Sequence, residues 1–556
     1  MVLALVSGEN LVKLDPSSTE QPLKVLVSMT FGSRSHIKNI FEIGKTLQKR
    51  GHKLSYMAIE PYLRFADGYN VTRHQLGPSG IEVDDHRGIS ELNQVPVNPL
   101  LDTLDALIEH LPIIYRMTLK DVLDVIDLEK PDVMICDFFS PSCIDGAHQR
   151  KIPLITGLQT LDGPILPPTY VTGVLSYFPT TIKGLNFFQR FYSTAMYPLM
   201  ALPRYITLNT KINAERALFG IAPTTVVNVG NWDNSLKICN TFVGFEAARP
   251  LEPTMKLVGP IMSDEFSPLT QHLSSFLNTK QRVMYIAFGS GVVLSKKDVQ
   301  ILFSAVTQLV EEGKADGIVW ALGKTPHATF EASQVSTQVD GKTLHAEELL
   351  NNQHPKIQFA SWAPQVAILS HPAVRVFLSH GGLESIFEGI YAGTPILAMP
   401  FFSDQHRNGR KVVEMGFGGY SDRLTQTASS LHKVMSDMML DADGKLANSI
   451  LHWKVIARMN AKRKEEAANL VEEFALTNKV CRLAPGADPN APFSCGLDHL
   501  VPGYHKMNVL LAYGIDVFSF LGLLIFLGSL PGFFLLRSLS RYAFKSNDCS
   551  TKQKIL

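Results

Sequence analysis

The sequence lacks any strong bias of charge. Its 52 Lys and Arg residues are matched by 51 Asp and Glu residues, and the net charge is +1. Without a basic excess there is no electrostatic case for a nucleic-acid partner. Charged residues make up only 19% of the chain and apolar residues 45%, which excludes a largely disordered protein.

Cysteine is scarce, and several catalytic motifs are missing. Six cysteines in 556 residues exclude a disulfide scaffold, and no Cys-x-x-Cys pair or acidic cluster indicates a metal site. There is no G-x-S-x-G turn of a serine hydrolase. The stretch Phe31–His36 after the first predicted strand is not the G-x-G-x-x-G that a dinucleotide-dependent oxidoreductase needs.

One long apolar run is present near the end of the chain. Val517–Leu536 carries no charge and is long enough to cross a bilayer of ~30 Å. The alternative, a buried core helix, fits poorly with a position after all the globular sequence. Because basic residues follow at once, we predict a transmembrane helix within residues 509–536 and a basic cytosolic tail at 537–556. The last residues, Lys552–Leu556, resemble a dilysine signal for return to the endoplasmic reticulum.

This topology places the bulk of the chain in the lumen, where an entry signal is needed. Met1–Ser7 is apolar but has no basic region before it, so either the true start lies upstream or the topology is inverted. Asn70-Val71-Thr72 is a sequon that only a lumenal protein would use. Cys481 and Cys495 could pair in an oxidising compartment, or both could be free thiols.

At 556 residues the chain is too long for one core, and its pattern predicts two α/β blocks. In the first, Lys24–Met29 and Leu54–Ile59 are predicted strands, and Ile37–Arg50 is a predicted helix capped by Gly51. This βαβ unit implies a parallel sheet. A loop, Thr30–His36, joins its first strand to its helix.

The second block repeats the pattern after a Gly-Pro linker. A strand at Val283–Phe288 precedes a helix at Lys297–Glu312 and another strand starting at Ile318. We therefore predict an α/β protein with two facing doubly wound, Rossmann-like domains. The boundaries are a leader at 1–21, domains at 22–250 and 256–430, closing helices at 431–480 and a linker at 481–508.

The densest chemistry lies between Phe359 and Gln405. A predicted strand ends in the turn Ser379-His380-Gly381-Gly382, and a helix follows. Such a turn lets the backbone approach an anion closely, while the helix N-terminus offers free N–H groups to it. Ser385 adds a hydroxyl, and Glu388 one turn later can accept two hydrogen bonds from a ribose diol. Trp362 supplies a flat face on which a base can stack.

This stretch closely resembles the donor-binding signature of the UDP-glycosyltransferase family, whose members include UDP-glucuronosyl- and UDP-glucosyltransferases. The resemblance implies a glycosyltransferase B-type fold, with an acceptor-binding domain at 22–250 and a UDP-sugar-binding domain at 256–430. It also implies that a UDP-sugar acts as co-substrate and that no separate cofactor or metal is needed. By this resemblance, Trp362 would stack on uracil, Gln365 would contact the nucleoside, Glu388 the ribose, Asp404 and Gln405 the sugar, and Ser290, His380, Gly382 and Ser385 the diphosphate.

One position departs from the family pattern. Many members have Asn before the serine, where this chain has Glu384. An outward-facing carboxylate there would be an ordinary first-turn acid that favours the helix dipole, and we favour that interpretation. An inward-facing one would repel the diphosphate and weaken donor binding.

Transfer to an alcohol also needs a base. His36 follows the first strand and Asp137 ends the strand beginning at Asp132, so in a doubly wound sheet both open on the same crevice. Their surroundings, Arg34-Ser35-His36-Ile37 and Asp137-Phe138-Phe139, resemble the family's catalytic pair. There the histidine is the base and the aspartate orients it, which implies direct displacement with inversion at C1.

The sequence therefore predicts a membrane-anchored hexosyltransferase of the endoplasmic reticulum that glycosylates a hydroxyl of a lipophilic acceptor. The apolar stretch Leu158–Tyr205 suggests the greasy acceptor. A catalytically inactive UDP-sugar-binding scaffold is the alternative, and Glu384 is its only support. Which sugar is used, and whether the chain forms a homo-oligomer, stay open.

Overall fold

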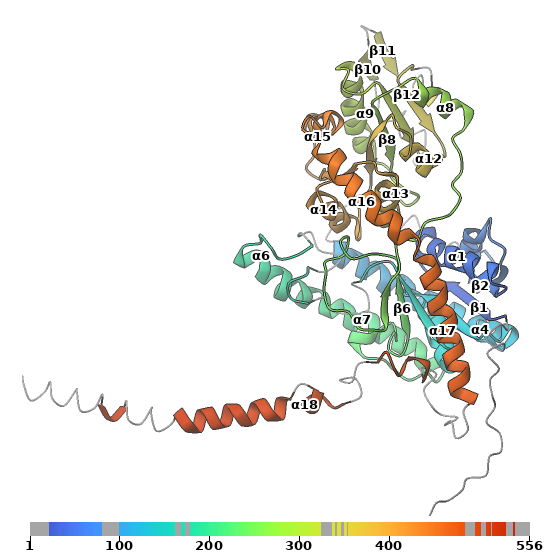
Figure 1. The fold of residues 1–556 in the computed structure, drawn as a ribbon, viewed down its shortest axis with the longest axis vertical. Coiled ribbons are helices and arrows are strands. Elements are labelled where there is room, and N and C mark those ends of the chain that lie inside the picture. The colour runs from blue at the N-terminus through green and yellow to red at the C-terminus, as the bar shows by residue number, and fades with distance from the viewer. Residues whose placement is uncertain are drawn as a thin grey trace, which may run out of the picture. The chain divides into compact units, whose positions relative to one another are not determined.

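The computed structural model describes residues 22–80, 99–161, 168–172, 178, 180–323, 336–339, 342–345, 350–352, 354–483, 495–501, 507–512, 514–529 and 537–539. The described residues up to 497, apart from 252–254, form one compact unit (Figure 1). Residues 252–254 and the described residues after 497 form a second unit. The predicted leader and almost all of the predicted basic tail lie outside the described residues.

The first sheet has seven strands in the order β3-β2-β1-β4-β5-β6-β7, and all neighbours are parallel. Strand β1 lies inside the sheet between β2 and β4, where burial on both faces explains its apolar run. The strands are β1 (Lys24–Met29), β2 (Lys53–Ile59), β3 (Thr72–Leu76), β4 (Val133–Asp137), β5 (Leu154–Leu158), β6 (Leu236–Cys239) and β7 (Met255–Leu257).

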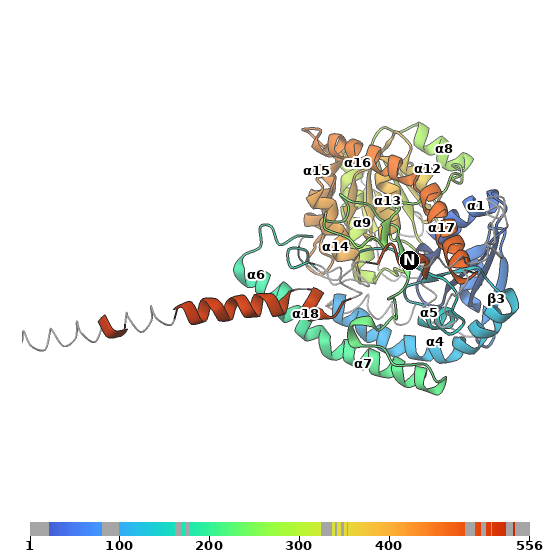
Figure 2. The ribbon, with the colours of Figure 1, turned by 60° about the horizontal axis from the view of Figure 1, so that its bottom comes forward.

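Helices connect these strands, as right-handed parallel crossovers require. The long helices α4 and α7 lie side by side (Figure 2). The first domain contains α1 (Arg34–Lys49), α2 (Glu60–Leu63), η2 (Arg64–Ala66), α4 (Pro99–Glu129), α5 (Pro141–Gln149), α6 (Phe187–Phe191), the π-helical turn η3 (Tyr192–Met196), α7 (Tyr197–Leu218) and η4 (Val226–Asn228).

The second sheet has six parallel strands in the order β12-β9-β8-β13-β14-β15. These are β8 (Val283–Ala287), β9 (Gly317–Ala321), β12 (Ile357–Ala360), β13 (Val374–Ser379), β14 (Ile396–Ala398) and β15 (Gly418–Tyr420), with a separate hairpin of β10 (Ser336–Val339) and β11 (Lys342–His345). The helices are α8 (Gln271–Asn278), α9 (Lys296–Glu311), α12 (Gln365–Leu369), α13 (Leu383–Ala392), α14 (Gln405–Glu414), α15 (Ala428–Leu440), α16 (Lys445–Ala461) and α17 (Lys464–Leu483).

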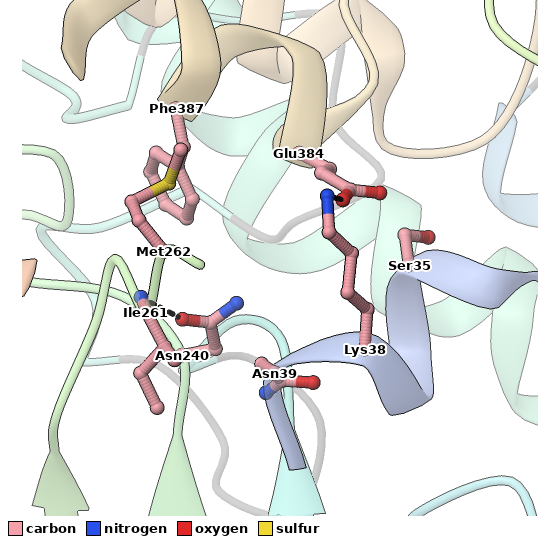
Figure 3. Close-up of a pocket in the computed structure, with 8 residues that line it drawn as sticks. All are labelled: Ser35, Lys38, Asn39, Asn240, Ile261, Met262, Glu384 and Phe387. Atoms are coloured by element: carbon pink, nitrogen blue, oxygen red, sulfur yellow. Dashed lines mark hydrogen bonds and ion pairs between the residues drawn. The ribbon is translucent and has the colours of Figure 1, made fainter. Parts of the chain in front are cut away.

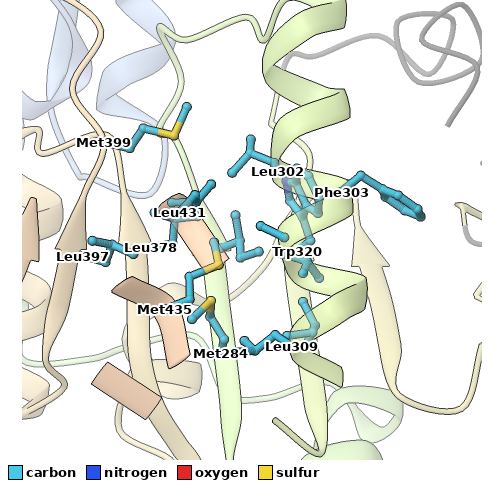
Figure 4. Packing of buried hydrophobic residues seen from close by; sticks show 14 of the residues in the cluster. Met284, Leu302, Phe303, Leu309, Trp320, Leu378, Leu397, Met399, Leu431 and Met435 are labelled. Carbon is cyan, nitrogen blue, oxygen red and sulfur yellow. The ribbon is translucent and has the colours of Figure 1, made fainter. Parts of the chain in front are cut away.

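The core of this second domain fills the space between the sheet and the helices α9 and α15 (Figure 4). Trp320 of β9, Leu302 of α9 and Met435 of α15 are all fully buried in it. Close packing of such large side chains makes the sheet a rigid support. The loops that follow β8, β13 and β14 are therefore held in place at one edge of the sheet.

Most predicted elements are confirmed, with three differences. Helix α1 begins at Arg34, so His36 is its third residue and not the end of a loop; Ser33, in an extended conformation, is the N-cap. The first sheet runs to Leu257, because β7 pairs with β6. The last helix, α17, returns to the first domain and contacts α1, where Arg50 binds Glu465 and Glu472.

The described residues contain two disulfides. The Cys481–Cys495 pair considered from the sequence is formed, and a second bond joins Cys136 of β4 to Cys143 of α5. The 3-10 turn η5 (Cys495–Leu497) ends the first unit. The second unit contains α18 (Val509–Ala512) and a helical stretch at 515–529 with exposed apolar side chains, including Phe518 at 68%. Within the described part of the chain, no helix has the length and apolarity that a membrane crossing needs.

Candidate active site

The predicted catalytic pair is assembled. The His36 Nδ1 atom lies 3.1 Å from Asp137 Oδ2, although the residues are far apart in the chain. Asp137 is fully buried at the end of β4, while the His36 side chain keeps 19% of its surface exposed. The other Asp137 oxygen accepts a hydrogen bond from the Phe139 backbone N–H at 3.0 Å. Because the ionised carboxylate only accepts, the neutral imidazole carries its proton on Nδ1 and leaves Nε2 as a base.

The chain around His36 is shaped to hold the ring. Its plane stacks against Phe138 and Phe139, with centroids 5.7 and 5.8 Å away. Gly32 has φ of +120°, and a Cβ there would lie 3.3 Å from the imidazole. Glycine is therefore needed for both the backbone conformation and the space. The Gln159 side chain donates to the His36 carbonyl and fixes the start of α1.

Charge controls the basicity of His36. Burial disfavours the imidazolium, but the Asp137 carboxylate and then Asp404 of the second domain outweigh it and raise the pKa of His36 above its ordinary 6.5. Asp404 sits at the N-cap of α14, so a charge of the second domain acts on His36. The raised pKa makes the neutral imidazole a stronger proton acceptor than an unperturbed histidine.

The donor-binding turn has the features of an anion site. Gly382 is the N-cap of α13, and the half-buried His380 lies beside it; the buried Nδ1 atom of His380 has no hydrogen-bond partner among the described residues. A Cβ on Gly382 or on Gly289 would come within 2.3 or 2.7 Å of the His380 ring. Burial lowers the pKa of His380 to about 4, so the imidazole stays neutral. A neutral ring with an unpartnered nitrogen fits a hydrogen bond to a phosphate oxygen.

The predicted ribose ligand is held by neighbours. Gln365 donates to Glu388 Oε2 at 2.7 Å and lies 3.3 Å from Ser385 Oγ. The Gln365 carbonyl accepts from the Tyr285 hydroxyl at 3.3 Å, a contact that the sequence did not reveal. Burial, and then the charge of Glu384, raise the pKa of Glu388 against the opposing effect of Lys38.

The remaining predicted donor contacts differ in exposure. Trp362 is 67% exposed in the turn after β12, so its indole face is open to a stacking partner. Ser290 is exposed in the turn after β8. Gln405 is buried, and its carbonyl accepts from the backbone of Phe401 and Phe402, so only its amide nitrogen could donate to a sugar.

Glu384 has a partner that neither interpretation of the sequence included. It forms an ion pair with Lys38 of α1, at the edge of a pocket between the domains (Figure 3). The same ammonium lies 3.2 Å from Glu388 Oε1. Lys38 was not predicted as a site residue; its one signal in the sequence is its position two residues after His36 on the same helix.

The chain is similar to known glycosyltransferases over most of its length. The family model "UDP-glucoronosyl and UDP-glucosyl transferase" matches residues 120–452. The UDP-glycosyltransferase stmC of Aspergillus ustus is 30% identical over 471 residues, covering 81% of this chain and 86% of that protein. The chain belongs to this family. A UDP-glycosyltransferase of Talaromyces amestolkiae is 28% identical over 465 residues, covering 81% of this chain and 86% of the relative.

Solved structures agree in fold with this UDP-glycosyltransferase. The glycosyltransferase of kitacinnamycin superposes with a TM-score of 0.55 at 17% identity, covering 82% of this chain and 99% of that one. The two predicted Rossmann-like domains and the glycosyltransferase B-type fold are thereby confirmed. The prediction of a UDP-dependent glycosyltransferase is confirmed by the family match, and the oxidoreductase and inactive-scaffold alternatives lose their support.

We predict a specific pH response for this UDP-glycosyltransferase. A base must be neutral to act, so kcat/KM should fall as the pH drops through a pKa above 6.5. In Asp137→Asn the main charge that raises the pKa of His36 is gone. The acid limb of this variant's pH profile should move to lower pH, and the rate of the variant should fall by about 10²–10⁴-fold.

Asp127→Asn is the matched control, because Asp127 pairs with Arg150 away from the site. Its pH profile should equal that of the wild type. An unchanged acid limb in Asp137→Asn would show that another group titrates.

Proposed function

We propose that this enzyme transfers a hexosyl group from a UDP-sugar, with inversion, to a hydroxyl group of a lipophilic acceptor. The observation that carries the proposal is the His36–Asp137 pair, which lies where the second domain's Asp404 affects its titration. A proton acceptor and a predicted sugar ligand of the second domain are thus near enough for their charges to interact. This is the arrangement that a direct displacement at the anomeric carbon requires.

The donor would bind to the second domain. Trp362 would stack on uracil, with Gln365 at the nucleoside and Glu388 at the ribose hydroxyls. The diphosphate would lie at the N-terminal end of α13, where His380, Gly382 and Ser385 are grouped. Ser290, in the turn after β8, would be a further diphosphate ligand. Asp404 and Gln405 would contact the sugar. The open indole, the unpartnered His380 nitrogen and the N-cap glycine support these assignments.

The chemistry then follows from the state of His36. Its Nε2 takes the proton of the acceptor hydroxyl while that oxygen forms a bond to C1 of the sugar. The bond from C1 to the UDP oxygen breaks on the opposite face, and UDP leaves with both electrons. The Asp137 carboxylate stabilises the imidazolium, and the N–H groups at the start of α13 stabilise the diphosphate.

The acceptor class is proposed from exposed apolar surface. Helices α6 and α7 and the turn between them expose Phe187, Phe188, Phe191, Leu199 and Leu202, with Phe188 at 78%. The Phe187 ring contacts those of Phe188 and Phe191, and exposed apolar surface of this kind is typical of binding sites for apolar molecules or lipid. A lipophilic alcohol at a membrane surface would fit the exposed apolar side chains of α6 and α7.

Membrane anchoring and lumenal location are further parts of the proposal. The uncharged run 517–536 supports an anchor, and the exposed apolar side chains at 517–527 argue against the buried core helix considered from the sequence. The two disulfides are typical of an oxidising compartment. The sequon residue Asn70 is exposed, as an N-glycosylation site in the lumen must be.

The stereochemistry of the product tests the proposed reaction. Incubating the full chain with α-linked, labelled UDP-glucose or other UDP-hexoses and a panel of lipophilic and hydrophilic alcohols should give labelled β-glycosides of the lipophilic members. NMR of the first-formed product reports the anomeric configuration.

His36→Ala should bind UDP but transfer no label. An α-configured product would contradict the displacement, and preference for hydrophilic alcohols would contradict the acceptor class.

The anchor is tested in cell membranes. We expect the full chain to stay in the membrane pellet after alkaline extraction, and to carry a glycosidase-sensitive mass that Asn70→Gln removes. A Leu524→Arg and Leu527→Arg double variant should be released, because charges at the centre of a span are costly. Release of the unaltered chain would contradict the anchor. The lumenal location would be contradicted if Asn70 carried no glycan and protease added outside intact membrane vesicles digested the globular domains.

A further inference from the structure

The entrance of α13 carries more negative charge than a diphosphate site should. Glu384 is the second residue of the helix, and Glu388 follows one turn later. The helix N-terminus favours a single anion, but two carboxylates beside it would repel the phosphates of a donor. The site needs a cation, and the second domain's described residues place none against Glu384.

Lys38 of the first domain fills this role. Its ammonium is paired with Glu384 and lies 3.2 Å from Glu388 Oε1, so one cation contacts both carboxylates (Figure 3). The side chains of Lys38 and Glu384 are only 28% and 36% exposed, which limits screening by water. Burial works against the ammonium, but the two carboxylates outweigh it and raise the pKa of Lys38, so it stays charged.

We propose that Lys38 is a positioning residue of the donor site, which neutralises Glu384 so that the helix entrance can accept a nucleoside diphosphate. The inference rests on the proposed function and adds a residue from the acceptor domain to donor binding. Lys38 also holds Glu388 in place, because Lys38 and Gln365 each contact a different oxygen of that carboxylate. Glu384 and Lys38 thus act as a pair, and the acid is tolerated only with its partner.

Lys38 lies on α1, two residues from His36. The ion pair therefore connects the helix that carries the proposed base to the helix that holds the donor. Donor binding and the alignment of His36 depend on the same contact between domains.

The test is a double-mutant cycle in the full chain, read by calorimetric titration with UDP and by steady-state kinetics. Lys38→Met leaves Glu384 uncompensated, so the Kd for UDP and the KM for the UDP-sugar should rise about tenfold or more, with kcat changing much less. Lys38→Arg keeps the cation and should bind UDP like the wild type. Lys38→Met with Glu384→Gln should recover UDP binding to within about threefold of the wild type.

Lys49→Met is the matched control. Lys49 lies on the same helix and pairs with Asp264 at the surface, so its loss should leave UDP binding unchanged. The inference is overturned if Lys38→Met binds UDP normally, or if adding Glu384→Gln restores nothing. Failure of the wild type itself to bind UDP would instead overturn the proposed function.

Discussion

The hydrogen bond between His36 and Asp137 joins two segments that are 101 residues apart. It exists because β1 and β4 are parallel neighbours, so the residues that follow β1 and end β4 emerge at the same edge of the sheet. The buried carboxylate fixes the tautomer of the imidazole and raises its pKa. Both the proposed base and its strength follow from this one contact.

In the second domain, parallel strands likewise bring distant residues to one end of a sheet, and these are the predicted donor ligands. There β8, β13 and β14 run parallel, and the turns that follow them carry Ser290, His380 and Asp404. The C-terminal ends of the strands in the two sheets face each other, since Lys38 forms an ion pair with Glu384 and the charge of Asp404 raises the pKa of His36. Helix α17 adds a second connection by returning to α1. The site depends on these contacts between domains as much as on either sheet.

Where strands were predicted, as at Lys24–Met29 and Val283–Phe288, they match β1 and β8 almost to the residue, because a short apolar run has few alternatives. The buried strands β5 and β6 were not predicted. The His36–Asp137 pair could also be predicted, since parallel topology brings strand ends together. The N-terminal end of α1 could not, because Ser33 and Ser35 both suit a cap. The partner of Glu384 is 346 residues away and reaches it from the other domain, so no local pattern could reveal it. The Cys136–Cys143 bond likewise depends on how β4 and α5 pack.

A crystal structure of the full enzyme with UDP and an unreactive hydroxyl acceptor tests the central claim most directly. The account predicts uracil on Trp362, the diphosphate at the start of α13, and the acceptor hydroxyl within hydrogen-bond distance of His36 Nε2. An acceptor oxygen bound away from that nitrogen, or a diphosphate far from His380, would contradict it.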